Sequence, residues 1–119
     1  MPTLAAILAD YPPDYLGLCY DSGHGNVARD GLDWLDKLKD RLISIHLHDN
    51  DGLKDLHTLL FRGTVDWPRL AKLLAASAYR KPISMETVMR NTGIDQPEAF
   101  LARAFETGST FADMVADAR

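Results

Sequence analysis

The sequence has a single cysteine, Cys19, so the chain cannot form an internal disulfide. A lone cysteine suits a reducing compartment, and we expect a cytoplasmic protein. No apolar run approaches the roughly 18 residues that a membrane span needs. The first residues also lack the basic and then apolar pattern of a signal peptide. We therefore expect a soluble, untargeted protein with no membrane partner.

Clusters of basic residues are also missing. The 119 residues include 13 Lys and Arg against 17 Asp and Glu, a formal net charge of −4 at pH 7. Proteins that bind duplex nucleic acid concentrate positive charge on one surface, because phosphate contacts dominate their affinity. We therefore expect no nucleic-acid partner. Hydrophobic residues make up 46% and charged residues 25%, which is typical of a globular protein, and the length fits one domain over residues 1–119.

Helical and strand patterns alternate along the chain. Apolar spacing and capping residues predict helices over residues 2–10, 31–41 and 66–79, and a last helix that opens near Asp95 and Glu98 as a capping-box variant. Short apolar runs predict strands over residues 16–21, 42–47 and 82–86, with a Gly-rich loop at 22–26 and a polar loop at 48–64. Strands that alternate with amphipathic helices predict right-handed crossovers and a parallel α/β sheet.

A residue type that binds metal ions stands at or next to the end of each predicted strand, namely Asp21, His46 and Glu86. A small residue stands two positions earlier in each strand, so the three side chains share one face of the sheet. Neighbouring parallel strands lie about 4.8 Å apart, close enough for three such side chains to reach one ion at about 2 Å. Polar residues also gather at strand ends simply because loops begin there, so spacing alone leaves a metal site and a solvated edge both open.

Five short motifs, in order, resemble those of the xylose isomerase-like sugar phosphate isomerase/epimerase superfamily. They are Tyr-Asp-Ser-Gly-His-Gly-Asn at 20–26, Ile-His-Leu-His-Asp-Asn-Asp-Gly at 45–52, Asp-Leu-His at 55–57, Gly-Thr-Val-Asp-Trp at 63–67 and Ile-Ser-Met-Glu at 83–86. The family is built on a (β/α)8 TIM barrel with a divalent metal at the carboxyl ends of its strands. The resemblance therefore implies the last three β/α units of such a barrel, an incomplete barrel of parallel strands with flanking helices.

The resemblance also implies roles for individual residues. Asp21, His46 and Glu86 would be metal ligands, and Glu86 would also be the base that moves a proton next to a carbonyl, through an enediolate. His24 matches a position that contacts substrate in epimerases or a further zinc ion in the endonuclease IV branch, and His57 matches a loop histidine. Epimerases carry an arginine six residues after the metal histidine. This chain has a glycine there, and Lys54 is the nearest cation and a candidate substrate contact.

Two histidines compete for the place on the second strand. His48 shares a strand face with His46, and either could be the ligand. The small-residue repeat and the family's His-x-x-Asp pattern, here His46 to Asp49, both favour His46. The ion itself is left open, because a mixed Asp, His and Glu set suits Mn²⁺, Co²⁺ or Zn²⁺, with Mg²⁺ also acceptable.

A complete (β/α)8 barrel needs about 250 residues, so three hypotheses follow for this shorter chain. The first is a metal-dependent isomerase or epimerase of a small sugar or sugar phosphate, inactive until it joins its N-terminal half. The second is a non-catalytic metal-binding fragment that forms homo-oligomers. The third is part of an endonuclease IV-like zinc phosphodiesterase, which the acidic charge balance disfavours.

Overall fold

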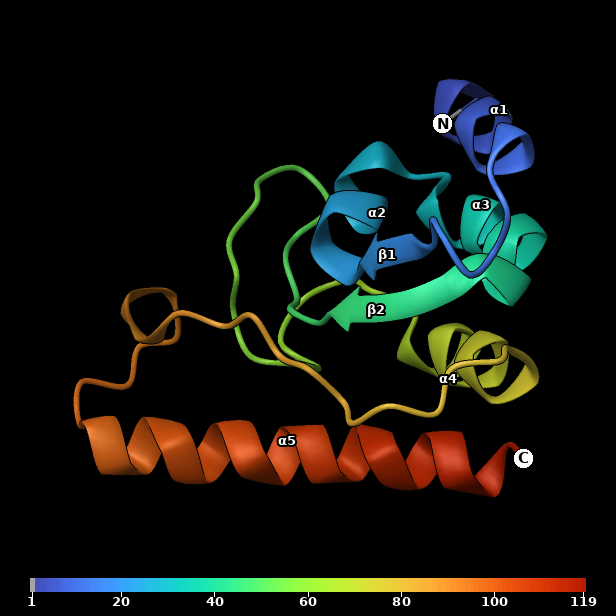
Figure 1. Cartoon of the computed structure of the whole chain (residues 1–119). Coiled ribbons are helices and arrows are strands. Elements are labelled where there is room, and N and C mark those ends of the chain that lie inside the picture. The colour runs from blue at the N-terminus through green and yellow to red at the C-terminus, as the bar shows by residue number, and fades with distance from the viewer. Residues whose placement is uncertain (1) are drawn as a thin grey trace.

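Helices and parallel strands alternate in the computed structural model, which describes residues 2–119. The elements, labelled in Figure 1, are α1 (Pro2–Asp10), β1 (Leu18–Asp21), α2 (Ser22–Ala28), α3 (Gly31–Leu38), η1 (Lys39–Arg41), β2 (Leu42–His46), α4 (Trp67–Ala76), η2 (Met89–Asn91) and α5 (Pro97–Asp117). β1 and β2 pair in parallel, and helices flank this open sheet without closing it. The fold is therefore that of a partial barrel, as the sequence predicts.

The third predicted strand is only partly formed. Residues 82–86 run parallel to the extension of β2 and are held by two hydrogen bonds, from Leu47 N to Ser84 O (3.0 Å) and from Glu86 N to Leu47 O (2.9 Å). Pro82 has no N–H to donate, and no other strand among residues 2–119 pairs with this segment. The expected strand is thus a bridge that lies beside β2 and still brings Glu86 to the same edge as the ends of β1 and β2.

The two faces of the sheet have different surroundings. Leu18, Tyr20 and Ile45 point into the helix-covered core, whereas Cys19 and His46 are exposed on the opposite face. A bulge pairs Leu18 with Leu42 and Cys19 with Ser44, so Ile43, although part of the apolar run of β2, is unpaired and 46% exposed. The open face therefore carries the side chains that a closed barrel would turn towards its axis.

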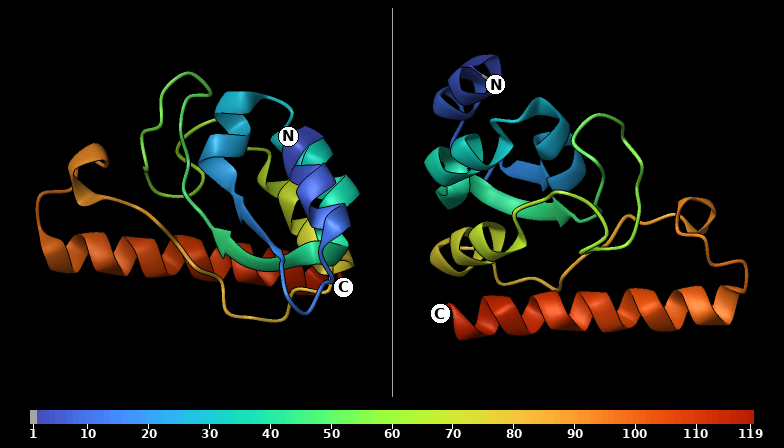
Figure 2. Two further views of the ribbon diagram at one scale, coloured as in Figure 1. Left: turned by 45° about the horizontal axis from the view of Figure 1, so that its top comes forward. Right: turned by 180° about the vertical axis from the view of Figure 1, so that it is seen from behind.

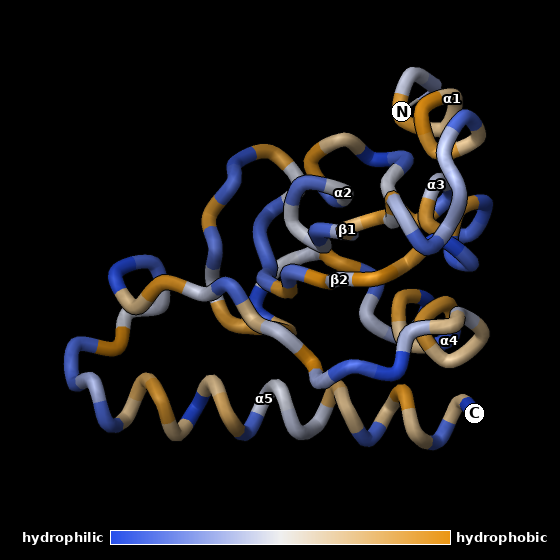
Figure 3. Tube along the Cα trace, viewed as in Figure 1, coloured by the Kyte–Doolittle hydropathy of each residue, from blue (hydrophilic) through white to orange (hydrophobic). Residues whose placement is uncertain are grey.

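The core lies between the sheet and the helices α3, α4 and α5. Figure 1 and the view from behind in Figure 2 place α4 between β2 and α5. Hydrophobic residues follow both strands and recur along α4 and α5 (Figure 3). Trp67 is central to this packing: its ring contacts Phe111 of α5 and Phe61 of the preceding loop. The C-terminal helix is thus attached to the rest of the fold through aromatic contacts.

Two local predictions were wrong in detail. Residues 22–26, predicted as a loop, begin helix α2, because Asp21 caps it by accepting a hydrogen bond from His24 N at 2.9 Å. The last helix begins at Pro97 with Gln96 as its N-cap, so Asp95 does not cap it. Asp66, the first residue of the predicted helix 66–79, is the N-cap of α4 and accepts from Arg69 N at 3.0 Å.

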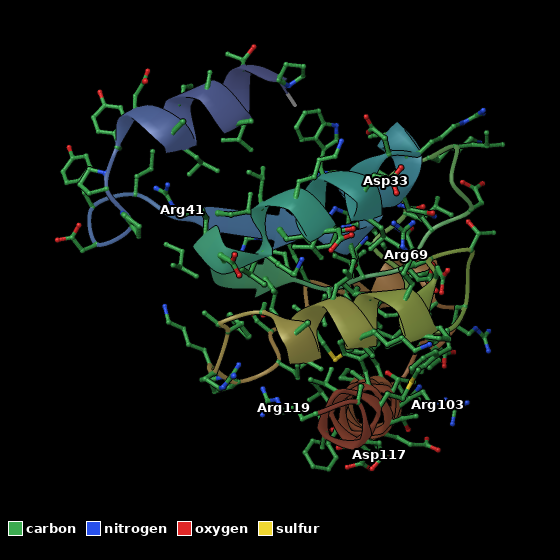
Figure 4. The ribbon with its side chains drawn as sticks, turned by 90° about the vertical axis from the view of Figure 1, so that its right-hand side faces the viewer. Asp33, Arg41, Arg69, Arg103, Asp117 and Arg119 are labelled. Atoms are coloured by element: carbon green, nitrogen blue, oxygen red, sulfur yellow. The ribbon has the colours of Figure 1, made fainter. Side chains whose placement is uncertain are left out.

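Two arginines connect elements across the surface (Figure 4). Arg41 donates to the carbonyl groups of Leu8 and Tyr11 (2.9 Å for Tyr11) and to that of Leu16 at 2.8 Å, and so holds α1 and the turn after it. Arg69 of α4 pairs with Asp33 of α3 at 2.6 Å. Within the described part of the chain, no helix has the length and apolar character required to cross a membrane.

Candidate metal centre

Asp21, His46 and Glu86 converge at the carboxyl edge of the sheet. Each offers one ligand atom, and the three atoms lie within 4.8 Å of one another. His46 Nδ1 is 3.0 Å from Glu86 Oε2. The strand pairing explains this arrangement, because Asp21 and His46 are register partners on β1 and β2, and Glu86 bonds to the residue after His46. The structure thus brings together the three residues that strand alternation placed on one face.

The carboxylate of Asp21 is held in a defined orientation. Its Oδ1 accepts from the backbone N–H of His24 at 2.9 Å and lies 3.0 Å from His48 Nε2. Partial burial alone would raise the pKa of Asp21, but the His48 ring and the His24 N–H more than offset it, so the pKa is lowered. Asp21 is therefore an ionised, pre-oriented oxygen donor.

A second group of donors lies beside the first. His24 Nε2 and His57 Nε2 are each 3.1 Å from the same oxygen of Asp55, and the three ligand atoms again lie within 4.8 Å of one another. His24 reaches this group from the first turn of α2, and Asp55 and His57 come from the loop after β2. Asp55 was not assigned a role from sequence, although a carboxylate two residues before a histidine was a visible signal.

The orientation of His57 follows from its hydrogen bonds. Its Nδ1 donates to the backbone carbonyl of Glu86 at 2.8 Å, which turns Nε2 towards Asp55. Partial burial alone would lower the pKa of His57, but this carbonyl and Asp55 raise it. For Asp55 the opposite holds: burial alone would raise its pKa, but His24 and His57 lower it. Asp55 is thus a carboxylate that lies between the imidazole rings of His24 and His57.

Two other residues considered from the sequence, Lys54 and His48, are members of neither three-donor group. Lys54 is exposed, and its ammonium makes no hydrogen bond or ion pair with any residue of 2–119; only its backbone N–H bonds to Asp51, at 2.8 Å. His48 is fully buried, and its Nε2 lies 3.0 Å from Asp21 Oδ1. His46 is the histidine whose ligand atom groups with those of Asp21 and Glu86, so the alternative ligand, His48, lies outside the three-donor set.

Two buried polar residues, Asp49 and Asn50, anchor the loop that follows β2, and this structural role was not predicted from sequence for either. Asp49 is fully buried and accepts three hydrogen bonds, from Trp67 Nε1 (2.8 Å), Asn50 N (2.9 Å) and Val65 N (3.2 Å). The Asn50 side chain donates to Gly23 O at 2.9 Å. Together they fasten the long loop to the start of α2. The His-x-x-Asp pattern therefore joins a candidate ligand to a structural anchor.

The donor chemistry of the first group fits a divalent cation. Two carboxylates and one imidazole offer oxygen and nitrogen ligands of the kind that Mn²⁺, Co²⁺ and Zn²⁺ accept. His46 and Glu86 are both about half exposed, so a cation could reach them from solvent. The ring of His48 lies 3.0 Å from Asp21 Oδ1 and gives this carboxylate a polar neighbour of the kind that orients metal-binding carboxylates.

A partial barrel of parallel strands with candidate metal ligands at its carboxyl edge is typical of TIM-barrel proteins, and comparison with known families agrees with this class. The family model of the xylose isomerase-like TIM barrel matches residues 1–106. The chain therefore belongs to the xylose isomerase-like TIM barrel family, and its fold is of the sugar isomerase and epimerase type.

Known proteins match the chain over only part of their own length. It is 40% identical over 116 residues to the uncharacterized protein y4fM of Sinorhizobium fredii, covering 97% of this chain and 37% of that protein. It is 30% identical over 87 residues to the uncharacterized protein MJ1311 of Methanocaldococcus jannaschii, covering 71% of this chain and 30% of that protein. A crystal structure of a D-tagatose 3-epimerase-like protein superposes with a TM-score of 0.73 at 24% identity, covering 96% of this chain and 41% of that one. The chain thus spans well under half of the proteins that it resembles.

Proposed function

We propose that this chain forms part of a divalent-metal-dependent isomerase or epimerase that acts on a small sugar or sugar phosphate. The observation that carries the proposal is the convergence of Asp21, His46 and Glu86 at the carboxyl edge of a partial barrel. Barrel enzymes of this architecture place their active sites at this edge. Membership of the xylose isomerase-like family supports the choice of reaction.

In this proposal Asp21, His46 and Glu86 hold the cation. Bound there, a divalent cation would supply Lewis acidity that polarises the carbonyl of an open-chain sugar. The Glu86 carboxylate takes the proton from the carbon next to that carbonyl, and the C–H electrons form the double bond of an enediolate. Return of the proton by Glu86 to the neighbouring carbon, with one hydroxyl proton passing between the two oxygens, gives the isomer; delivery of a proton to the opposite face by a second acid, which residues 2–119 do not supply, gives the epimer. His24, His57 and Lys54 are the candidate contacts to the sugar.

The first test measures metal binding by the purified chain. We expect one equivalent of Mn²⁺ by calorimetry, confirmed by elemental mass spectrometry of a gel-filtered peak. Asp21→Asn should weaken binding at least tenfold, because it removes the charge of the best-oriented ligand. Asp113→Asn is the matched control, since it makes the same charge change on the exposed surface of α5. Equal binding by the wild type and Asp21→Asn would reject this metal site.

We expect little or no turnover from the 119 residues alone. The sheet is open, and the chain spans 37% of y4fM and 41% of the epimerase-like structure. We propose that the active unit forms by homo-oligomerisation or by association with an N-terminal half of the barrel, in the cytoplasm. Epimerisation of a ketose by the isolated chain, abolished by Glu86→Gln, would contradict the expected inactivity while supporting the assigned base.

One observation favours a second candidate function, a zinc phosphodiesterase. His24, Asp55 and His57 form a second three-donor group next to the first, and a pair of adjacent metal sites suits the hydrolysis of phosphate esters. This function predicts at least two Zn²⁺ ions per chain, one of them lost in His57→Gln. It also predicts cleavage of bis-p-nitrophenyl phosphate. One ion per chain and no cleavage would leave the isomerase as the better assignment.

A further inference from the structure

His48 lies between the two donor groups and is itself fully buried. Its Nε2 is 3.0 Å from Oδ1 of Asp21 and 3.7 Å from Oδ1 of Asp55. Its ring stacks on that of His57, with centroids 3.7 Å apart and planes 9° from parallel. One imidazole therefore contacts a member of the first group and two members of the second.

The residues after β1 form a close-fitting socket for this ring. Ser22 Oγ donates to the backbone carbonyl of His48 at 2.7 Å and accepts from its backbone N–H at 2.9 Å. Gly23 lies against the ring, and a Cβ at this position would be only 1.9 Å from Cε1 of His48. The Asp-Ser-Gly sequence at 21–23 thus supplies a contact for Nε2, a clamp for the backbone and the space for the ring.

The burial of a polar ring at this place requires an explanation. Nδ1 of His48 has no hydrogen-bond partner in the described chain, and the contact of Nε2 with Asp21 is not an aligned hydrogen bond. An incompletely paired polar group costs free energy in a protein interior, whereas a leucine would fill the same space without that cost. The imidazole is therefore poorly explained by packing alone.

We propose that His48 is a positioning residue that holds Asp21 of the first donor group and His57 of the second. In this arrangement Nε2 carries the proton, because a bare lone pair would face the oxygens of Asp21 and Asp55. The electrostatic attraction of this N–H for Oδ1, at 3.0 Å, limits the rotation of the Asp21 carboxylate, and the stacked ring limits that of His57. This inference rests on the proposed metal-binding function of Asp21.

The first test separates the polar role of His48 from its packing. His48→Leu keeps an apolar side chain of similar size and removes the donor, whereas His48→Gln keeps an N–H group. We expect His48→Leu to weaken Mn²⁺ binding 10- to 100-fold, as the loss of such partners typically does, and His48→Gln to recover most of this loss. Unfolding in urea should be similar for the two variants. If both bind Mn²⁺ as the wild type does, the positioning role is wrong.

The second test needs no metal. Long-range ¹H–¹⁵N correlation spectra of the histidine rings in the metal-free chain should show His48 protonated at Nε2, with a signal that shifts in Asp21→Asn but not in Asp113→Asn. Protonation at Nδ1 alone would overturn the inference.

The two proposals fail separately. If Asp21→Asn abolishes Mn²⁺ binding and His48→Leu does not, the metal site stands and the role of His48 is rejected. If the wild type binds no Mn²⁺, the proposed function fails, and the spectra still test the contact between His48 and Asp21.

Discussion

Replacing Asp49 by asparagine tests whether this buried carboxylate anchors the loop below the site. Asp49 Oδ1 accepts from the N–H groups of Asn50 (2.9 Å) and Val65 (3.2 Å), and Oδ2 accepts from Trp67 Nε1 (2.8 Å). An asparagine can satisfy the first two with its single oxygen, but its NH₂ group then faces the indole N–H. Two donors would meet in a fully buried place.

The expected cost follows from this geometry. One charge-assisted hydrogen bond is lost, and two buried donors are left unsatisfied, which together lower the free energy of unfolding by about 3 kcal/mol. Urea denaturation followed by tryptophan fluorescence measures this change. The loop should loosen first, with faster amide hydrogen exchange at Val65 and at Thr58, which pairs with Asp49 through both backbone groups.

A double-mutant cycle with Trp67→Phe tests whether the meeting of two donors at the indole N–H causes the loss of stability in Asp49→Asn. Phenylalanine removes the N–H, so Trp67→Phe should cost less in the Asp49→Asn background than in the wild type, by about 1 kcal/mol or more. Circular dichroism replaces fluorescence for these variants. Because the cavity left by the smaller ring is common to both backgrounds, it cancels in the cycle. Additive effects, within about 0.5 kcal/mol, would refute the hydrogen-bond argument.

Three further substitutions test the surrounding structure. Gly23→Ala places a methyl group 1.9 Å from the His48 ring, so we expect a loss of about 3 kcal/mol in urea; an unchanged midpoint would contradict the socket. Gly93→Ala adds its methyl group to open space but keeps a φ of 73°, so the loss should be about 1 kcal/mol from backbone strain alone. Arg41→Met removes the donors that hold α1, and amide exchange in α1 should accelerate while that in β2 does not; equal exchange in both would contradict this role.

The fold was predictable where one pattern dominated. The apolar repeats of α3 and α4 and the short apolar runs of β1 and β2 decide between helix and strand locally, and Asp66 caps α4 at the start of the predicted helix. The helix after Asp21 was missed because glycine usually marks a loop. Here Gly25 allows close packing instead: a Cβ on Gly31 would be only 2.3 Å from its Cα. This close approach of the Gly25 and Gly31 backbones leaves no apolar periodicity in the sequence from which a helix could be predicted.

The part of the site that lies at the strand ends was predictable from the alternation of side chains along a strand. Alternation places Asp21, His46 and Glu86 on one face, and the parallel pairing brings them to one edge. The roles of Asp49 and Asp55 depend on how the loop at 48–64 folds back, which is set by long-range hydrogen bonds rather than by local spacing. For the same reason the burial of His48 could not be inferred, since β2 ends at His46 and the ring of His48 is covered by Gly23 and His57, which are distant in sequence.

The capping of α2 by Asp21 has a consequence for how a cation would bind. The carboxylate that faces His46 and Glu86 also accepts the N–H of His24 in the first turn of the helix, so the rotational entropy of this side chain is lost when the chain folds. A cation therefore meets a ligand that is already immobilised, and less entropy remains to be lost on binding. By thermodynamic linkage, an ion held by Asp21 would also stabilise the start of α2. Binding of a cation by Asp21 should therefore reduce fraying at the start of α2, and fraying of this helix should weaken cation binding.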